Sequence, residues 1–187
     1  MRFSVWQTDT YVVSSRFTAC CTQCFINDYA WLAGLSTITG GAGADRLTGG
    51  LGNDQFVFTA TDQGTDVITD FSISGGTGTD AISITNDAFG ITSNNLIQKG
   101  KVMDMNAADS NDIVILTDTE LPGNITGVLV NTIDTMALFF NTAESHVEVW
   151  YDNDWNDSSN REHLATLDNI NDIAEMTNFT SANFVVV

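Results

Sequence analysis

The stretch that decides the fold is "GGAGADRLTGGLGNDQFVF", residues 40–58. It contains a nine-residue motif twice, at 40–48 and 49–57. The motif has glycine at positions one, two and four, aspartate at position six and an apolar residue at position eight. A further copy, "GGTGTDAIS", lies at 75–83. Residues 31–39 keep the glycine at position four and the apolar residue at position eight, but they have serine in place of the aspartate at position six. This period is too short for a pair of helices, and it predicts a tight turn of about six residues followed by a strand of about three.

The residue types of the repeat predict what each position does. Glycine permits positive φ and close approach of two backbones, so carbonyl oxygens can point into the turn. The aspartate at position six adds a carboxylate at the end of the turn. Carbonyls and a carboxylate make an oxygen-only ligand set, which suits Ca²⁺. The apolar residue at position eight is expected to point from the short strand into a core, and ions shared by adjacent turns would replace part of the core that such thin strands cannot supply.

The repeat resembles the calcium-binding nonapeptide of RTX proteins. Residues 40–57 match that pattern closely, and residues 75–83 match it again. The segment "GTDVITDFSISGGTGTDAISIT" (64–85) resembles the end of the repeat block in serralysin-type and other RTX proteins, a likeness carried by Asp66, Ile68, Asp70 and Phe71. The resemblance implies a parallel β-roll, calcium in the turns, and secretion through a type I exporter that reads an uncleaved C-terminal signal.

In a β-roll, successive turns lie on opposite edges, so each turn is expected to stack on the turn eighteen residues later. The turn at 40–45 would then meet residues 58–63, which lack the glycines. The turn at 49–54 would meet residues 67–72, which offer Asp70. The ligand supply therefore predicts about one to three ions and some incomplete sites.

The candidate calcium ligands all lie at or beside a repeat turn and offer an oxygen atom. They are the carbonyls of Gly41, Gly43, Gly50 and Gly52, the carboxylates of Asp45, Asp54 and Asp70, and, as further candidates, Asp66 and Asp80.

The charge of the chain limits its partners. Its 187 residues, enough for one domain or two small ones, carry six Lys and Arg against 24 Asp and Glu, a net charge of −18. Such an anion is expected to repel nucleic acid and acidic lipid, and bound cations would stabilise its compact state. No run approaches the roughly 18 apolar residues of a membrane span, and "MRFSVWQTDTYVVSSRF" (1–17) lacks the unbroken apolar core of a cleaved secretory signal.

The first thirty residues do not continue the repeat. They hold the cysteines, all within "CCTQC" (20–24). An odd number of thiols so close together does not make a disulfide framework, and a zinc site would need a second pair. Residues 1–30 are therefore interpreted as a divergent, poorly ordered N-terminal segment without an assigned function.

After residue 86 the glycine density falls and the sequence becomes strand-like. Apolar alternation or short β-branched runs occur at 112–118, 146–154, 162–170 and 182–187. Residues 125–140 do not alternate cleanly and are also compatible with a helix. The expected fold is all-β, with a short parallel β-roll of calcium-binding nonapeptide repeats at 31–85 and a β-rich C-terminal cap at 86–187 that closes its open end.

The C-terminal segments 147–167 and 177–187 resemble the hairpin and the terminal phenylalanine-plus-aliphatic tail of RTX-type secreted proteins. This resemblance implies that the last few dozen residues are an export signal. The tail also has the pattern of a final core strand, and both roles are compatible.

The sequence does not indicate catalysis, because no HExxH, GxSxG, P-loop or GxGxxG pattern occurs. His146 and His163 lie on expected strands beside acids, a setting typical of surface ion pairs. The leading hypothesis is a non-enzymatic, secreted, extracellular module that folds on calcium and directs type I secretion of a larger protein, with calcium ions and the secretion machinery as partners. The alternatives are a C-terminal fragment of a secreted hydrolase (protease or lipase) and a calcium-stiffened surface adhesion module.

Overall fold

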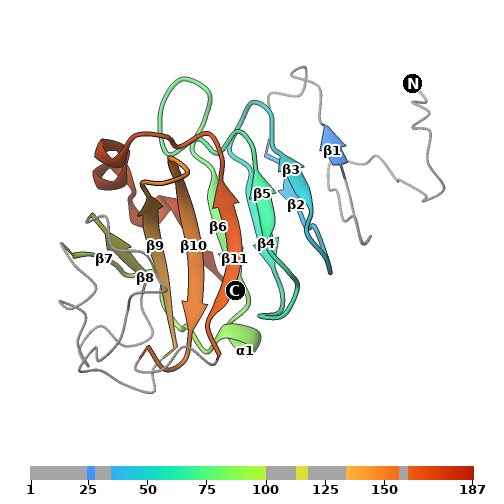
Figure 1. The fold of residues 1–187 in the computed structure, drawn as a ribbon. Coiled ribbons are helices and arrows are strands. Elements are labelled where there is room, and N and C mark those ends of the chain that lie inside the picture. Colours follow the sequence, from blue (N-terminus) through green and yellow to red (C-terminus); the bar gives the residue numbers. More distant parts are fainter. Residues whose placement is uncertain (1–24, 28–34, 100–112, 118–133, 156–159) are drawn as a thin grey trace, which may run out of the picture.

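A computed structural model describes residues 25–27, 35–99, 113–117, 134–155 and 160–187 (Figure 1). The regular structure of the described part is mostly β-strand, arranged in two sheets, with a few short helices. The all-β expectation is confirmed, although the sheets contain both parallel and antiparallel pairs.

Sheet A has the order β1-β3-β5-β11-β10-β9-β8-β7. Its strands are β1 (Phe25–Asn27), β3 (Arg46–Thr48), β5 (Asp66–Ile68), β7 (Leu96–Lys99), β8 (Ile113–Leu116), β9 (Thr135–Asn141), β10 (His146–Asp152) and β11 (Glu162–Leu167). Sheet B has the order β12-β6-β4-β2. Its strands are β2 (Thr37–Ile38), β4 (Gln55–Phe58), β6 (Ala81–Ile84) and β12 (Phe184–Val186). The short helices are α1 (Asn86–Phe89), η4 (Ile173–Asn178) and η5 (Ser181–Asn183).

Consecutive strands of the repeat segment alternate between the two sheets. β2, β4 and β6 pair in parallel in sheet B, while β3 and β5 pair in parallel in sheet A. We call residues 35–85 the repeat coil, because each pair of turns carries the chain from one sheet to the other and back.

The apolar residue at position eight of each repeat points into the space between the sheets. Ile38, Leu47, Phe56 and Ile82 are each at most 1% exposed. They are also in register, since Ile38 pairs with Phe56 and Phe56 with Ile82. The predicted inward role of this position is confirmed.

Strands from the second half of the chain extend both sheets of the coil. β11 pairs in parallel with β5, and β12 pairs in parallel with β6. β9, β10 and β11 form an antiparallel meander that continues sheet A, and β8 and β7 follow it in parallel (Figure 1). The expected strands at 112–118, 146–154, 162–170 and 182–187 are confirmed as β8, β10, β11 and β12.

The helix considered for residues 125–140 is wrong where the structure describes that segment. Thr135–Asn141 is the strand β9, and all seven of its residues are buried. Residues 125–133 lie outside the described residues.

The segment before the repeats contributes one described strand. β1 pairs in parallel with β3, with Ile26 opposite Leu47, and so lengthens sheet A at its N-terminal end. The other residues of 1–30, including all three cysteines, lie outside the described part of the chain.

A row of contacting aromatic side chains links the coil to the C-terminal tail. The rings of Phe56 and Phe71 are 6.0 Å apart, those of Phe71 and Phe179 6.1 Å, and those of Phe179 and Phe184 6.2 Å. Asn183 is fully buried, and its Nδ2 donates to the carbonyls of Ile73 and Asp80. The tail is therefore part of the core, as the final-strand interpretation expected.

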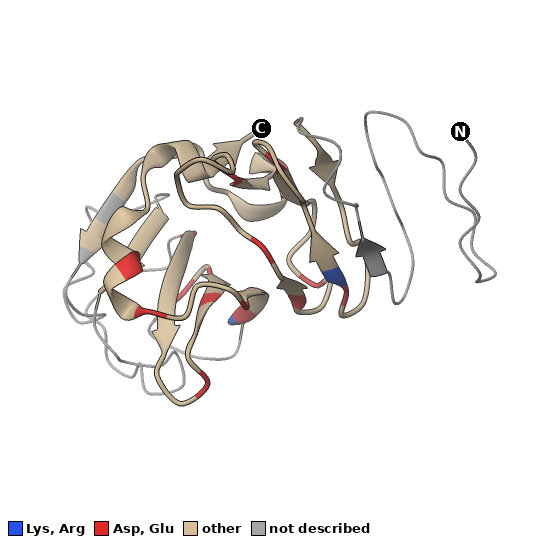
Figure 2. Ribbon diagram, turned by 90° about the horizontal axis from the view of Figure 1, so that it is seen from above, with Lys and Arg blue, Asp and Glu red and all other residues tan. Residues whose placement is uncertain are grey.

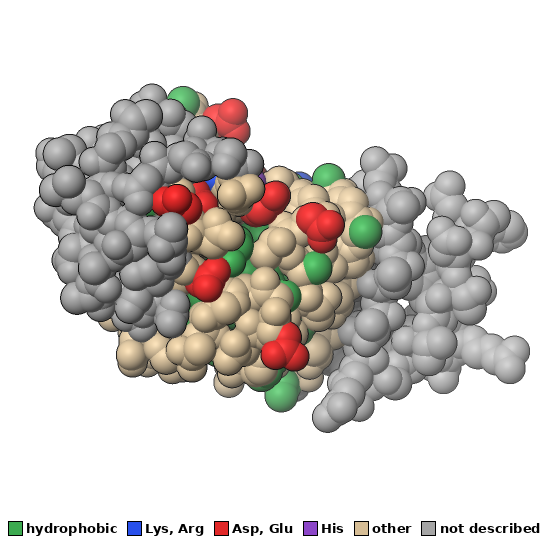
Figure 3. Space-filling model, turned by 90° about the horizontal axis from the view of Figure 1, so that it is seen from below, with side chains coloured by type: hydrophobic (Ala, Val, Ile, Leu, Met, Phe, Trp, Pro, Cys, Tyr) green, Lys and Arg blue, Asp and Glu red, His purple; other side chains and the backbone are tan. Residues whose placement is uncertain are grey.

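The surface of the described residues carries few exposed large apolar side chains. Those with the greatest exposure are Leu35, Leu51 and Val187. On the face shown in Figure 3, acidic side chains stand apart from one another and hydrophobic ones form isolated spots. Among the helices that the structure describes, none has both the length and the apolar character that a membrane crossing requires.

Candidate calcium sites at the edges of the coil

Because the coil strands alternate between sheets, its turns lie on two edges. The first edge carries the turns that lead from sheet B to sheet A, at 39–45 and 59–65. The second edge carries the turns that lead from sheet A to sheet B, at 49–54 and 69–80. Figure 2 shows acidic positions far outnumbering basic ones along the described ribbon.

The uniform eighteen-residue stacking of turns is wrong for the described coil. Asp45 N donates to Asp66 Oδ1, 21 residues later, and Gly43 N donates to the carbonyl of Gln63. Asp54 N donates to Asp80 Oδ1, 26 residues later. A spacing of eighteen occurs between Ser36 and Asp54. The connection at 59–65 that meets the turn at 40–45 overlaps the expected segment 58–63, and Gln63 contacts Gly43, but the carboxylate that meets Asp45 is that of Asp66, at the start of β5.

The first edge brings Asp45 and Asp66 together in a buried setting. Their exposed fractions are 2% and 3%. Both Oδ2 atoms face the backbone of Gly40, where an added Cβ would lie 2.7 Å from Asp66 Oδ2 and 2.9 Å from Asp45 Oδ2. Two carboxylate oxygens therefore converge on a residue with no room for a side chain.

The second edge also buries two acids in stacked turns, Asp54 and Asp80, each 1% exposed, but there only Asp54 faces the glycine that begins the turn. Asp54 Oδ1 accepts from Ser36 N at 2.9 Å, and a Cβ on Gly49 would lie 2.7 Å from Asp54 Oδ2. Asp80 Oδ1 accepts from Asp54 N, and its Oδ2 accepts from Ser72 N, both at 2.8 Å. The carboxylates of Asp54 and Asp80 thus each join their own turn to the preceding turn on the same edge.

The carbonyls of Gly43 and Gly52 also face the next turn. A Cβ on Gly64 would lie 2.2 Å from Gly43 O, and one on Gly78 would lie 1.6 Å from Gly52 O. Gly43 and Gly52 have φ of 119° and 132°, which L side chains rarely adopt. Of the other predicted carbonyl ligands, Gly41 and Gly50 have φ of 92° and 90°.

Asp70 occupies a different position from the other acids. Its Oδ1 accepts from Gly49 N at 2.9 Å and its Oδ2 from Gly50 N at 2.8 Å. The Asp70 carboxylate therefore accepts hydrogen bonds from two backbone N–H groups at the start of the turn at 49–54. Its role as a calcium ligand stays a prediction.

The surroundings of Asp66 and Asp80 disfavour the ionised form of both carboxyl groups. Burial raises the pKa of Asp66 to about 7, and the charge of Asp45 adds to the increase. Burial likewise raises the pKa of Asp80 to about 6, with further increases from the charges of Asp54 and Asp70. A cation between such carboxylates would favour their ionised form.

The donor set fits a hard cation. Within the described residues, no three His, Cys, Asp or Glu side chains gather in a way that could hold a metal. Each edge instead offers a pair of carboxylates, so further ligands would have to be backbone carbonyls such as those of Gly43 and Gly52. An all-oxygen set of this kind suits Ca²⁺ and not the nitrogen and sulfur preference of Zn²⁺.

Sequence reasoning missed the groups that hold Asp80 in place. Ser72 N binds its side chain, and Asn183 Nδ2 binds its carbonyl from 103 residues away at 3.0 Å. Ser72 lies in the family-like segment 64–85, but no sequence signal indicated Asn183.

Comparison with known families supports the identity of the repeats. Residues 32–57 match the hemolysin-type family model described as the RTX calcium-binding nonapeptide repeat (4 copies). The chain is thus a protein with RTX-type calcium-binding repeats, as the resemblance implied. No curated protein and no solved structure matched the chain.

Proposed function

We propose that the chain is a calcium-binding RTX module whose repeat coil is a β-roll that folds when extracellular calcium occupies its two edges. The observation that carries this proposal is the pairing of buried carboxylates, Asp45 with Asp66 and Asp54 with Asp80, in stacked turns. The alternation of parallel strands between two sheets supports the β-roll geometry.

Calcium would act on folding because the paired turns exist only in the folded chain. An ion that binds the folded form alone converts its binding energy into folding energy. At a free calcium concentration 100 times the dissociation constant, each site adds about 2.7 kcal/mol. Inside the cell, where calcium is scarce, repulsion between paired carboxylates would keep the coil loose.

We also propose that the module is non-catalytic, is secreted to the extracellular space, and directs type I secretion of a larger protein through its C-terminal tail. The resemblance of residues 147–167 and 177–187 to RTX-type termini supports the export role. The carboxylates of the coil bind backbone N–H groups of neighbouring turns, which favours a structural role over an acid–base role.

The proposal is tested by calcium titration followed by far-UV circular dichroism and calorimetry. Calcium should increase the β-signal and release or absorb heat, and a chelator should reverse the spectral change. The double variant Asp45→Asn/Asp54→Asn should lose most of the response, while Asp87→Asn, an exposed acid in α1, should keep it. An unchanged spectrum together with no heat of binding would refute the proposal.

A further inference from the structure

The connection at 69–80, which completes the second edge, is longer than the nonapeptide turn on which it stacks. Its glycines Gly75 and Gly78 have φ of 134° and 132°, and a Cβ on Gly75 would have open space around it. Glycine loses more backbone freedom on folding than any other residue. Contacts outside the connection are therefore needed to fix its course and to hold Asp80 at its end.

The outer part of this connection lies against the turn at 49–54. Gly52 N donates to the carbonyl of Thr77 at 2.8 Å, and a Cβ on Gly78 would lie 1.6 Å from the carbonyl oxygen of Gly52. That carbonyl is one of the predicted calcium ligands. The course of the connection therefore affects a carbonyl ligand as well as the carboxylate of Asp80.

Asn183 of the C-terminal tail binds both ends of the connection. Its Nδ2 donates to the carbonyl of Ile73 at 2.9 Å and to that of Asp80 at 3.0 Å, and both hydrogen bonds are buried. Its Oδ1 accepts from Thr180 N at 2.9 Å. These partners determine the amide orientation, because a carbonyl only accepts and an N–H group only donates. Loss of the amide would therefore remove the donor of two carbonyls that water cannot readily reach.

Ser72 and Asp80 bind each other but need an anchor outside their own connection. Ser72 N donates to Asp80 Oδ2, and Asp80 N donates to the carbonyl of Ser72, both at 2.8 Å. On the coil side this pair is held by Asp54 N, which donates to Asp80 Oδ1. On the other side it is held by Asn183, since the pairing of β12 with β6 begins after Asp80, at Ile82.

The first edge is closed in a different way. The connection at 59–65 is closed from within, because Gln63 Oε1 accepts from Thr59 N at 2.9 Å and from Ala60 N at 3.2 Å. Asp66 follows this connection directly, at the start of β5. The first edge thus uses a side chain of its own connection, whereas the second edge uses a side chain of the tail.

We propose that Asn183 is a positioning residue of the second-edge calcium site, whose carboxylates are those of Asp54 and Asp80. Calcium affinity at this edge then depends on the docked tail, whereas affinity at the first edge does not. Because coupling between two sites is reciprocal, calcium at the second edge also holds the tail in place. This inference rests on the proposed calcium function and specifies how one of its two sites is controlled.

The test is a double-mutant cycle on the full chain, read by calcium calorimetry. Asp66→Asn weakens the first edge, so the tightest remaining binding reports the second edge, and Asp80→Asn does the reverse. Asn183→Ala should weaken calcium binding about 10-fold in the Asp66→Asn protein, because two buried carbonyls lose their donor. In the Asp80→Asn protein it should change the affinity by no more than about twofold, the scatter of independent substitutions.

The control is Asn94→Ala, which removes another amide that binds the tail. Asn94 Nδ2 donates to the carbonyls of Ser181 and Phe184, both at 3.3 Å. Its loss should leave both affinities within about twofold. A loss as large as that for Asn183→Ala would assign the effect to tail docking in general and overturn the specific role of Asn183.

Two further outcomes would overturn the proposal. Asn183→Ala could weaken calcium binding equally in both backgrounds, which would show that it lowers stability alone, or it could weaken binding in neither. A wild type that shows no heat of calcium binding would refute the calcium proposal itself, and this inference with it, so the wild type separates the two failures. Should Asn183→Ala fail to fold, Asn183→Ser, which keeps a shorter hydrogen-bond donor, takes its place in the same cycle with the same expected asymmetry.

Discussion

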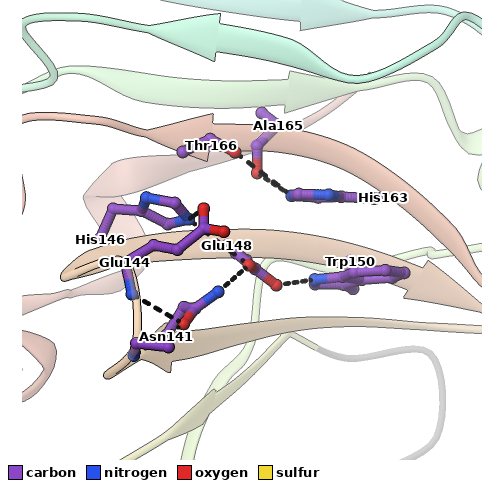
Figure 4. Close-up of polar contacts among 9 residues, drawn as sticks. Asn141, Glu144, His146, Glu148, Trp150, His163, Ala165 and Thr166 are labelled. Atoms are coloured by element: carbon purple, nitrogen blue, oxygen red, sulfur yellow. Dashed lines mark hydrogen bonds and ion pairs between the residues drawn. The ribbon is translucent and has the colours of Figure 1, made fainter. Parts of the chain in front are cut away.

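The repeat coil and the meander β9–β11 share one sheet but are stabilised in different ways. The coil strands are two to four residues long, and each turn buries an acid such as Asp45 or Asp54. The meander strands are six or seven residues long, and β9 is buried along its whole length. The meander also buries acids, but these have partners within the described residues, Arg161 for Asp152 and Asn141 for Glu148 (Figure 4). The coil instead combines a thin core with carboxylate pairs that require a counter-charge. The difference predicts that calcium controls one region and not the other.

Removal of calcium should therefore have the largest effect, and it should be confined to the coil. Backbone amides that join turns or coil strands, such as those of Val67 and Ala81, should lose most of their hydrogen-exchange protection in chelator. Amides within β9 and β10 should keep theirs, because no coil carboxylate lies on those strands. Exchange measured by mass spectrometry with and without calcium checks the prediction. Equal loss in both regions would show that the coil and the meander unfold as one unit.

A single carboxylate should have a smaller, local effect. Asp66→Asn should weaken calcium binding about 10-fold to 100-fold, or about 1.4–2.7 kcal/mol, because Asp66 faces Asp45 in a buried pair. Asp62→Asn is the matched control, since Asp62 is exposed and lies in the connection that leads from β4 to Asp66 at the start of β5. Calorimetry on both variants distinguishes the observed register from the eighteen-residue one. A larger loss for Asp62→Asn than for Asp66→Asn would contradict the observed stacking.

The coil was more predictable than the meander because its pattern assigns a role to each position. Glycine, aspartate and the apolar residue at position eight specify turn, carboxylate and core, and Leu47 and Phe56 are buried as that pattern requires. The spacing of later turns could not be predicted, because the 59–65 and 69–80 connections do not keep the nine-residue period. A turn can gain residues while the strand that follows it keeps its pairing register with the neighbouring strand.

The strand β9 could not be identified from periodicity, because both of its faces are covered. Leu138 belongs to the main core, and Phe139 packs on the opposite face with Trp155, at a ring distance of 5.8 Å. A strand buried on both faces has no polar residues to set a period of two, so its sequence is also compatible with a helix. Contacts between residues far apart in the chain, such as Asn183 with Asp80, also cannot be inferred from a single sequence.

The smallest expected effect concerns pH, and it tests why the coil needs calcium. In metal-free buffer the pKa of Asp66 is about 7 in the folded state against 3.8 for an unperturbed aspartate. A carboxyl group whose pKa is raised by folding stabilises the fold below the unfolded value, and this contribution is lost as the pH rises through the folded value. The metal-free coil should therefore become less stable between about pH 4 and pH 7, where protons substitute for the missing cation.

With saturating calcium this trend should flatten or reverse, because the ion holds the carboxylates ionised and its affinity rises as protons leave. The measurement is the urea midpoint of the coil, followed by hydrogen exchange at Val67, with and without calcium at pH 5 and pH 7.5. Asp66→Asn isolates the contribution of this group from that of His163, whose pKa is lowered by burial and whose contribution therefore has the opposite sign. If wild type and Asp66→Asn show the same pH dependence without metal, the repulsion within the Asp45–Asp66 pair is not what makes the coil depend on calcium.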